Sequence, residues 1–298
     1  MQDPDVAGGA LAPALERIWL VGCGAMGSAL AERWIAAGLA AARLTVIDPD
    51  PRGEVPAGAA RVATAADAAA RAAAPTAVVL AVKPQQLREA ADDLHRWLVH
   101  PPLLVSMLAG VRLATLAQLF PGARLARIMP NTPARLGRAI TVAHAPSLEE
   151  ADRAAVAWLC AAAGAVRWLD EESRLDAVTA ISGSGPAYLF RFIEALAGAG
   201  EAAGLDPDTA TALARETVVG AAALAGASDS PVATLRQQVT SPGGTTEAGL
   251  DVLDGDGALS ALLRATVRAA AERSRALAAQ AEVLAQHPEP PLREAHGG

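Results

Sequence analysis

The segment IWLVGCGAMGS, residues 18–28, decides the fold of this 298-residue chain. Four apolar residues, typical of a strand buried on both faces, lead directly into a G-x-G-x-x-G turn and then a helical pattern. In this motif Gly22 permits the tight turn, Gly24 lets a pyrophosphate approach the backbone, and Gly27 lets the helix pack closely on the strand. Strand, turn and helix in this order predict a dinucleotide at the helix N-terminus. The alternative is a tight turn that binds nothing.

Beyond this segment, short apolar runs alternate with helical patterns as far as residue 169. The runs typical of strands are 18–22, 44–48, 78–82, 103–107, 124–128, 140–143 and 166–169, with helical patterns at 25–37, 87–99 and 113–119. Strands alternating with helices are typical of a parallel sheet covered on both faces. The sequence therefore predicts an N-terminal α/β domain, a Rossmann-type doubly wound sheet, over residues 16–170.

After residue 170 only helical patterns follow. They cover 174–181, 186–203, 207–225, 232–239, 247–253 and 259–284. This predicts an all-α C-terminal domain over 171–286, with a flexible N-terminus (1–15) and a disordered tail (287–298). Asp206-Pro207 favours a helix start. Alanine-rich helices here have little polar face, so we expect at least a homodimer with this domain as the interface.

Composition argues against several classes of protein. The net charge is −7 and Lys83 is the only lysine, which disfavours nucleic-acid binding. The acidic N-terminus does not resemble a signal peptide, and no uncharged run has the length of a membrane span. Cys23 and Cys160 lack CxxC or histidine-rich neighbours, so no metal site is predicted and both suit a core. We therefore expect a cytoplasmic protein without a membrane partner.

The remaining cofactor residues follow other strand candidates. Asp48 lies about 20 residues beyond Gly27, where an acid binds the ribose of NAD and repels a 2′-phosphate, whereas Arg52 is suited to accept that phosphate. Both NADPH and NADH stay open. Lys83 should line the nicotinamide side, and Asn131 is suited to hold the carboxamide or ribose. The alternatives are a loop residue at Asp48, a surface lysine and an Asx-type turn. The predicted cofactor-binding residues are Gly22, Gly24, Ala25, Met26, Gly27, Asp48, Arg52, Val82, Lys83, Pro84, Ala109 and Asn131.

Two segments rich in glycine and small hydroxyl residues interrupt the helical patterns. They are SGSGPAY (182–188) and VTSPGGTTEAGL (239–250). Turns with many exposed N–H groups are nests for an anion such as a carboxylate. Helix caps are the alternative.

These residues make the sequence resemble the pyrroline-5-carboxylate reductases, which catalyse the last step of proline synthesis. The resemblance covers roughly residues 16–280. It is most specific over LRQQVTSPGGTTEAGLDVLD (235–254), with GCGAMG, AVKPQ, MPNTPA and ISGSGPAY in the same order and spacing as in that family. It implies a Rossmann domain joined to a helical dimerisation domain. It also implies interlocked dimers, often assembled into decamers, with the substrate site between one subunit's cofactor domain and the helical domains.

The resemblance further implies the reaction. Hydride passes from NADPH or NADH to the C=N of 1-pyrroline-5-carboxylate and gives L-proline. The protonated imine is already electrophilic, so the enzyme must mainly hold the carboxylate and orient the ring. Backbone N–H groups of Gly243, Gly244 and Thr245 are the expected carboxylate donors. Thr246 resembles the family threonine that hydrogen-bonds the ring nitrogen, and is assigned the catalytic role. The predicted substrate-binding residues are Ser241, Gly243, Gly244, Thr245 and Thr246.

Two departures and three alternatives accompany this interpretation. Asp48 stands where NADPH-preferring members have small polar or basic residues. The 229–234 connection looks slightly longer than usual, and Asp229 is a match for a family acid near the substrate amine. One alternative is a reductase of a six-membered cyclic imino acid. A β-hydroxyacid dehydrogenase would need a lysine in the second domain, and none follows Lys83. A non-catalytic nucleotide-binding scaffold should have lost the glycines or the Thr245-Thr246 pair.

Overall fold

The computed structural model describes residues 15–50, 52–98 and 100–286. The predicted tail (287–298) and all but the last residue of the predicted N-terminal segment lie outside the described residues. By packing, the described chain divides into two compact units. We call residues 15–183 with 270–286 the sheet unit and residues 184–269 the helical unit.

The sheet unit is built on eight strands in the order β3-β2-β1-β4-β5-β6-β7-β8. All neighbours are parallel except β6 and β7. Strand β1 lies between β2 and β4, so the sheet grows first to one side of β1 and then to the other, which confirms the predicted doubly wound topology. The strands are β1 (Ile18–Val21), β2 (Leu44–Ile47), β3 (Ala60–Val62), β4 (Ala77–Leu80), β5 (Leu103–Ser106), β6 (Arg124–Met129), β7 (Ala139–His144) and β8 (Gly164–Trp168).

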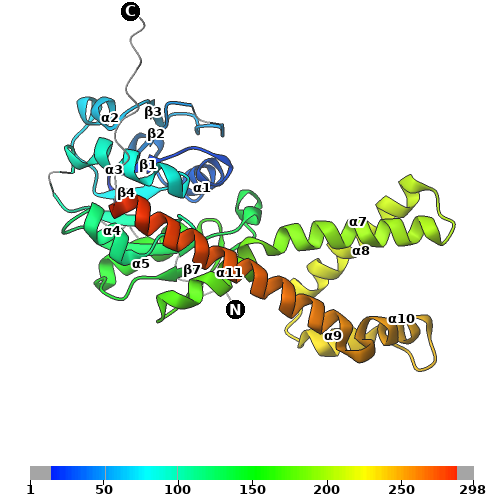
Figure 1. Cartoon of the computed structure of the whole chain (residues 1–298). Helices are drawn as coiled ribbons and strands as arrows, with labels where there is room; N and C mark the ends of the chain where they lie inside the picture. The colour runs from blue at the N-terminus through cyan, green and yellow to red at the C-terminus, as the bar shows by residue number, and fades with distance from the viewer. Residues whose placement is uncertain (1–14, 51, 99, 287–298) are drawn as a thin grey trace, which may run out of the picture. The chain divides into compact units, whose positions relative to one another are not determined.

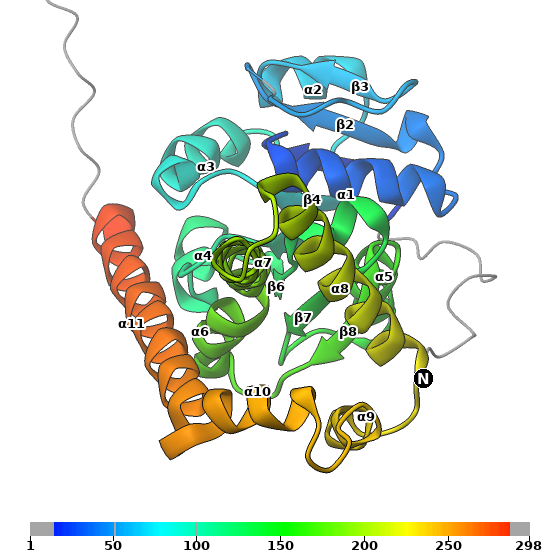
Figure 2. The same cartoon turned by 90° about the vertical axis from the view of Figure 1, so that its right-hand side faces the viewer.

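Helices cover both faces of this sheet. Because side chains alternate along a strand, Ile18 and Leu20 of β1 enter one core while Trp19 and Val21 enter the other. The first core contains α1 and α5, the second α2, α3 and α4; Figure 2 shows α1 and α5 on one side of the strands and α3 and α4 on the other. These helices are α1 (Ala25–Ala36), α2 (Ala65–Arg71), α3 (Leu87–His95), α4 (Leu113–Leu119) and α5 (Glu150–Ala161).

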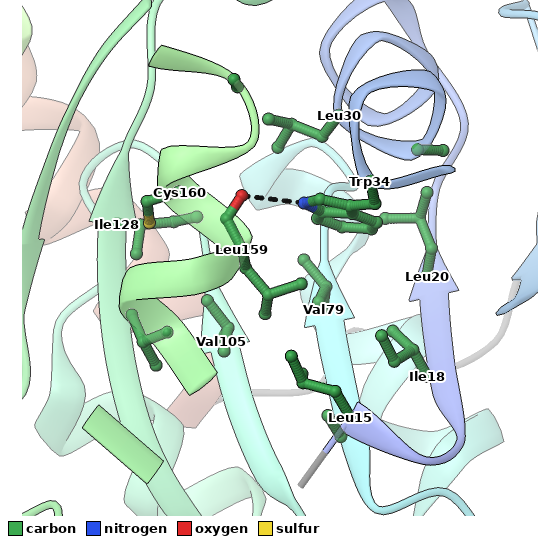
Figure 3. Packing of buried hydrophobic residues seen from close by; sticks show 14 of the residues in the cluster. Leu15, Ile18, Leu20, Leu30, Trp34, Val79, Val105, Ile128, Leu159 and Cys160 are labelled. Carbon is green, nitrogen blue, oxygen red and sulfur yellow. Dashed lines mark hydrogen bonds between the residues drawn. The ribbon is translucent and has the colours of Figure 1, made fainter. Parts of the chain in front are cut away.

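Trp34 fixes the helix that follows the glycine motif. It is fully buried between α1, α5 and the sheet, and its indole Nε1 donates a 2.8 Å hydrogen bond to the Leu159 carbonyl, as Figure 3 shows. A buried indole needs such an acceptor. Helix α1 is thereby held against α5 by both packing and a hydrogen bond.

The segment after β8 stays attached to the sheet unit through buried ion pairs. Arg127 of β6 contacts Glu172 at 2.7 Å, while Asp176 accepts hydrogen bonds from Arg112 (3.0 Å) and the Ser274 hydroxyl (2.7 Å). The packing division therefore falls at 183–184 and 269–270. The boundary predicted from the sequence, at 170–171, lies earlier in the chain, just after the last strand. The elements concerned are η6 (Glu172–Arg174), α6 (Leu175–Val178), the π-helical η7 (Thr179–Gly183) and the second part of α11 (Ala258–Gln286).

The helical unit begins with an antiparallel hairpin of α7 and α8, visible in Figure 1. The two helices lie close together at Gly200, where a Cβ would be only 3.2 Å from the Ala210 side chain. Asp206 caps α8, as predicted, by accepting a 3.0 Å hydrogen bond from the Thr209 N–H, and its hydrogen bonds with Thr209 lower the pKa of Asp206. The unit contains α7 (Gly185–Ala202), α8 (Pro207–Ala227), α9 (Val232–Gln238), α10 (Thr245–Asp254), η8 (Gly255–Gly257) and the start of α11.

The helical unit exposes many large apolar side chains. They include Leu189, Phe190, Leu213, Val219, Leu224, Val252 and Leu262. Their combined exposure is more than single surface leucines would explain, and is typical of an interaction surface. In the described part of the chain, no helix combines the length and apolar character needed to cross a membrane.

Candidate active site

The glycine turn after β1 has the close contacts that its motif predicts. Gly22 has φ +96°, and a Cβ there would lie 2.8 Å from the backbone of Ala81 at the end of β4. A Cβ at Gly27 would lie 2.5 Å from the Gly22 carbonyl oxygen. Glycine is therefore required at both positions, because the turn is packed against β4 on one side and against α1 on the other.

Gly24 differs from these two glycines because its surroundings are open. No atom lies within 4 Å of a Cβ built there. Gly24 is the N-cap of α1, has no side-chain cap hydrogen bond, and is followed by no acid in the first helical turn. Uncapped N–H groups and the positive end of the helix dipole attract an anion. The turn therefore fits a dinucleotide pyrophosphate.

Asp48 lies directly beside this turn. Its Oδ2 accepts a 2.6 Å hydrogen bond from the Cys23 N–H and its Oδ1 a 2.9 Å hydrogen bond from the Asp50 N–H. Burial, followed by the charge of Asp48, raises the pKa of the Cys23 thiol, which stays a core group. The carboxylate thus helps to hold the glycine turn in place.

Gly53 is a contact that sequence reasoning missed. Its N–H donates to the Cys23 carbonyl at 2.8 Å. A Cβ at this position would clash with Ser28 of α1, so only glycine lets the loop after β2 pack on the turn. A glycine immediately after Arg52 was the only signal in the sequence.

The other predicted cofactor loops lie at the same edge of the sheet. Arg52 follows β2, Lys83 follows β4 and Ala109 follows β5; these strands run parallel to β1, so their carboxyl ends share one edge. Lys83 and Arg52 are exposed, and Pro84 begins the short helix η4 (Pro84–Gln86). These predicted cofactor residues therefore all follow strands at one edge of the sheet.

Asn131, which follows β6, also makes structural hydrogen bonds. The residue is buried; its Nδ2 donates to the Ser182 carbonyl at 3.2 Å, and its Oδ1 accepts from the Ile140 N–H at 3.0 Å. Two of the four hydrogen-bonding positions of the amide are thus used internally. Asn131 supports the loop after β6 and has one amide hydrogen and one lone pair left for a ligand.

The predicted substrate loop belongs to the helical unit. Of its expected donors, Gly243 N–H donates to the Glu247 carboxylate at 2.6 Å and Gly244 N–H to the Ser241 carbonyl at 3.0 Å. Thr245 and Thr246 are exposed and begin α10, whose N-cap, Gly244, makes no side-chain cap. The uncapped donors are therefore at the first turn of α10. Sequence reasoning missed the contact of Glu247, although an acid in the first turn of a helix is a known cap signal.

Among the described residues, no group of three or more His, Cys, Asp or Glu side chains is placed to hold a metal ion. The chemistry available at the two loops is hydrogen bonding by backbone N–H groups and hydroxyls, which suits binding and orientation of anions.

Two family models match the chain. Residues 172–277 match the model described as pyrroline-5-carboxylate reductase dimerisation, and residues 17–110 match the model described as coenzyme F420-dependent NADP oxidoreductase.

Curated relatives and solved structures give a consistent result. The pyrroline-5-carboxylate reductase of Pseudomonas aeruginosa is 38% identical over 268 residues, which is 89% of this chain and 97% of the relative. That of Glycine max is 43% identical over 201 residues, 67% of this chain and 73% of the relative. The structure of the Coxiella burnetii pyrroline-5-carboxylate reductase matches with a TM-score of 0.80 and 32% identity, over 88% of this chain and 98% of the other. The Plasmodium falciparum enzyme with NADP bound matches with a TM-score of 0.75 and 28% identity, with the same coverage.

Proposed function

Because this chain belongs to the pyrroline-5-carboxylate reductase family, we propose that it reduces the C=N bond of 1-pyrroline-5-carboxylate to give L-proline. It is an NAD(P)H-dependent oxidoreductase, and the reaction is the final step of proline biosynthesis. The observation that carries this conclusion is the 38% identity to the Pseudomonas aeruginosa reductase over 89% of the chain.

The cofactor residues are proposed from their place at the carboxyl edge of the sheet. Gly22, Gly24 and Gly27 shape the turn, and the N–H groups at the start of α1, including those of Ala25 and Met26, face the pyrophosphate. Asp48 and Arg52 face the adenosine ribose. When bound, the nicotinamide supplies the hydride. The residues proposed on its side are Val82, Lys83, Pro84, Ala109 and Asn131.

The substrate residues are proposed from the loop before α10. The uncapped N–H groups of Thr245 and Thr246 bind the substrate carboxylate, helped by the dipole of α10. Ser241, Gly243 and Gly244 form the turn that presents them. The sequence alone predicted that the N–H groups of Gly243 and Gly244 also bind the carboxylate. Both N–H groups already donate hydrogen bonds within the loop, so the proposal assigns the carboxylate to the two threonine N–H groups instead.

Thr246 is proposed as the catalytic residue, through orientation of the ring. Its hydroxyl accepts a hydrogen bond from the protonated imine nitrogen and fixes the face of the C=N bond. A new C–H bond forms at the imine carbon while the π pair of the C=N bond becomes a lone pair on nitrogen. The ring nitrogen keeps its hydrogen, and the product amine takes a proton from water. No strong general acid is needed because the imine enters protonated.

Self-association is part of the same conclusion. Residues 172–277 match a dimerisation model, and most exposed large apolar side chains lie on α7, α8, α10 and the start of α11. We propose a homodimer through these helices, and further assembly of the dimers into a decamer. A cytoplasmic location is proposed from the two unpaired cysteines, both buried.

The activity is tested directly with purified protein. Mixed with 1-pyrroline-5-carboxylate, the protein should oxidise NADPH, NADH or both, and L-proline should accumulate in equal amount. Loss of nicotinamide absorbance and chromatography of the product measure the two. If a bound cofactor is demonstrated separately and neither is oxidised, the proposed substrate is wrong, and a six-membered cyclic imino acid is the next substrate to assay.

A further inference from the structure

We propose that Asp48 makes NADH, rather than NADPH, the preferred reductant of this chain. The inference rests on the proposed function, since it concerns the cofactor of that reaction. It starts from the backbone around Asp48, the first residue after β2. The Asp48 N–H donates to the Val62 carbonyl of β3 at 3.0 Å, and the preceding Ile47 carbonyl accepts from the Gly22 N–H at 2.9 Å. The backbone is therefore fixed to β3 on one side and to the glycine turn on the other.

The side chain of Asp48 is fixed as firmly. Each carboxylate oxygen has one backbone donor, Cys23 N–H at 2.6 Å and Asp50 N–H at 2.9 Å. A carboxylate has about four acceptor positions, so each oxygen retains a lone pair for another donor. At the end of the second strand of a doubly wound sheet, that donor is a ribose hydroxyl of the adenosine. The geometry thus suits the ribose of NADH.

A 2′-phosphate at this place would lie beside the negative carboxylate of Asp48, whose side chain cannot rotate away. A flexible surface acid would rotate into water when an anion approaches. Rotation of Asp48 would instead remove the acceptor of the Cys23 N–H, and Cys23 is fully buried within the turn. An unpaired N–H in such a position is unfavourable. The carboxylate therefore stays in place, and NADPH binds against its repulsion.

The arginines nearby do not reverse this charge. Residues 48–62 contain three acids and two arginines, so the loop after β2 is negative as a whole. Arg52 is exposed and is flanked by Asp50 and Glu54. The next residue, Gly53, is tied to the Cys23 carbonyl at 2.8 Å, which limits how far the chain at Arg52 can move toward a phosphate. Arg52 therefore moderates the repulsion without replacing it by a phosphate site.

The experiment measures dissociation constants of NADH and NADPH by calorimetry, together with kcat/KM for each. The wild-type protein should bind NADH at least about tenfold more tightly than NADPH. Asp48→Ser removes the charge and should reduce this preference by about tenfold or more, mainly through tighter NADPH binding. Asp48→Asn keeps one oxygen for the Cys23 N–H and should shift the preference in the same direction. Asp92→Asn changes an exposed acid of α3 that pairs with Arg88; it is the matched control and should leave both constants unchanged.

Two results would overturn the inference. One is a wild-type protein that binds NADPH as tightly as NADH or more tightly. The other is an unchanged preference in Asp48→Asn and Asp48→Ser proteins whose circular dichroism shows them folded. Both results leave the proposed reaction intact. Conversely, binding constants that favour NADH, with no turnover of 1-pyrroline-5-carboxylate, would contradict the proposed function and still support the role of Asp48.

Discussion

Three glycines of one turn have three different environments, and this makes the cofactor site testable residue by residue. Gly22→Ala should destabilise the sheet unit by on the order of 2–4 kcal/mol, because it combines φ +96° with a Cβ 2.8 Å from the Ala81 backbone. Gly24→Ala should change stability by less than about 1 kcal/mol, since its φ of −76° is allowed and its Cβ meets nothing. It should nevertheless weaken cofactor binding by roughly tenfold or more.

Denaturant unfolding and cofactor titration of both variants check this prediction. All five tryptophans lie in the sheet unit, so their fluorescence reports its unfolding. A Gly24→Ala protein that binds both reduced cofactors like the wild type would show that the pyrophosphate does not approach this residue.

Thr246 carries the prediction for chemistry at the substrate loop. Thr246→Ala should lower kcat/KM by on the order of 10- to 1,000-fold, as expected for loss of one hydrogen bond in the transition state. Thr246→Ser keeps the hydroxyl and is the matched control; it should retain most activity. Steady-state kinetics with the preferred cofactor measures both. Activity of Thr246→Ala within twofold or so of the wild type would remove this hydroxyl from the mechanism.

At the scale of elements, the buried contacts of Asp176 attach α6 and the second part of α11 to the sheet. Asp176→Ala leaves Arg112 and the buried Ser274 hydroxyl without their acceptor, and should lower the free energy of unfolding by about 2–4 kcal/mol. The comparison is Asp92→Ala, which removes an exposed i,i+4 pair with Arg88 and should cost less than about 0.5 kcal/mol. Urea unfolding followed by tryptophan fluorescence measures both; equal effects would mean that the Asp176 contacts do not stabilise the unit.

Elements with a strong local pattern could be predicted from the sequence. The apolar run before Gly22 predicts β1, and the alternating segments predict the doubly wound order, because burial of a parallel strand requires continuous apolar residues. Strand β3 (Ala60–Val62) could not be found this way, since it is short, lies at the edge and contains Arg61. The π-helical segment Thr179–Gly183 likewise has no local pattern of its own: its first three residues were predicted as ordinary helix, and its last two as part of the segment that interrupts the helices.

In the candidate site, too, some features could be predicted from the sequence and others could not. The glycines of the first turn could be predicted because each answers a local backbone requirement. The partners of Asp48, Asn131 and Glu247 could not, because each contact depends on where the fold or the turn places a backbone N–H or carbonyl. Packing across the boundary at residue 170 could not be predicted either, since the Arg112–Asp176 contact joins residues 64 apart in sequence.

At the scale of the whole molecule, the main unexplained feature is the exposure of large apolar side chains on the helical unit. Leu213 and Leu224 of α8 are 54% and 56% exposed, and their spacing of about three turns places them on one side of the helix. Apolar side chains exposed to water do not stabilise a single chain. In a symmetric dimer, the same side chains of both subunits are buried in the interface, which is favourable. The family model that matches this region is a dimerisation model.

Leu213→Glu and Leu224→Glu should therefore weaken the dimer. Each substitution removes a buried leucine, at about 1.5–3 kcal/mol per copy, and adds a charge in an apolar interface, so the dimer dissociation constant should rise by roughly 100-fold or more. Ala70→Glu adds the same charge at an exposed position of α2 and is the matched control. Sedimentation velocity over a range of concentrations measures the association, and activity should fall with the dimer fraction because the substrate loop is part of the helical unit. Unchanged sedimentation of both leucine variants would mean that this side of α8 faces solvent in the assembly, and the interface would have to be sought on the apolar side chains of α7, α10 and α11.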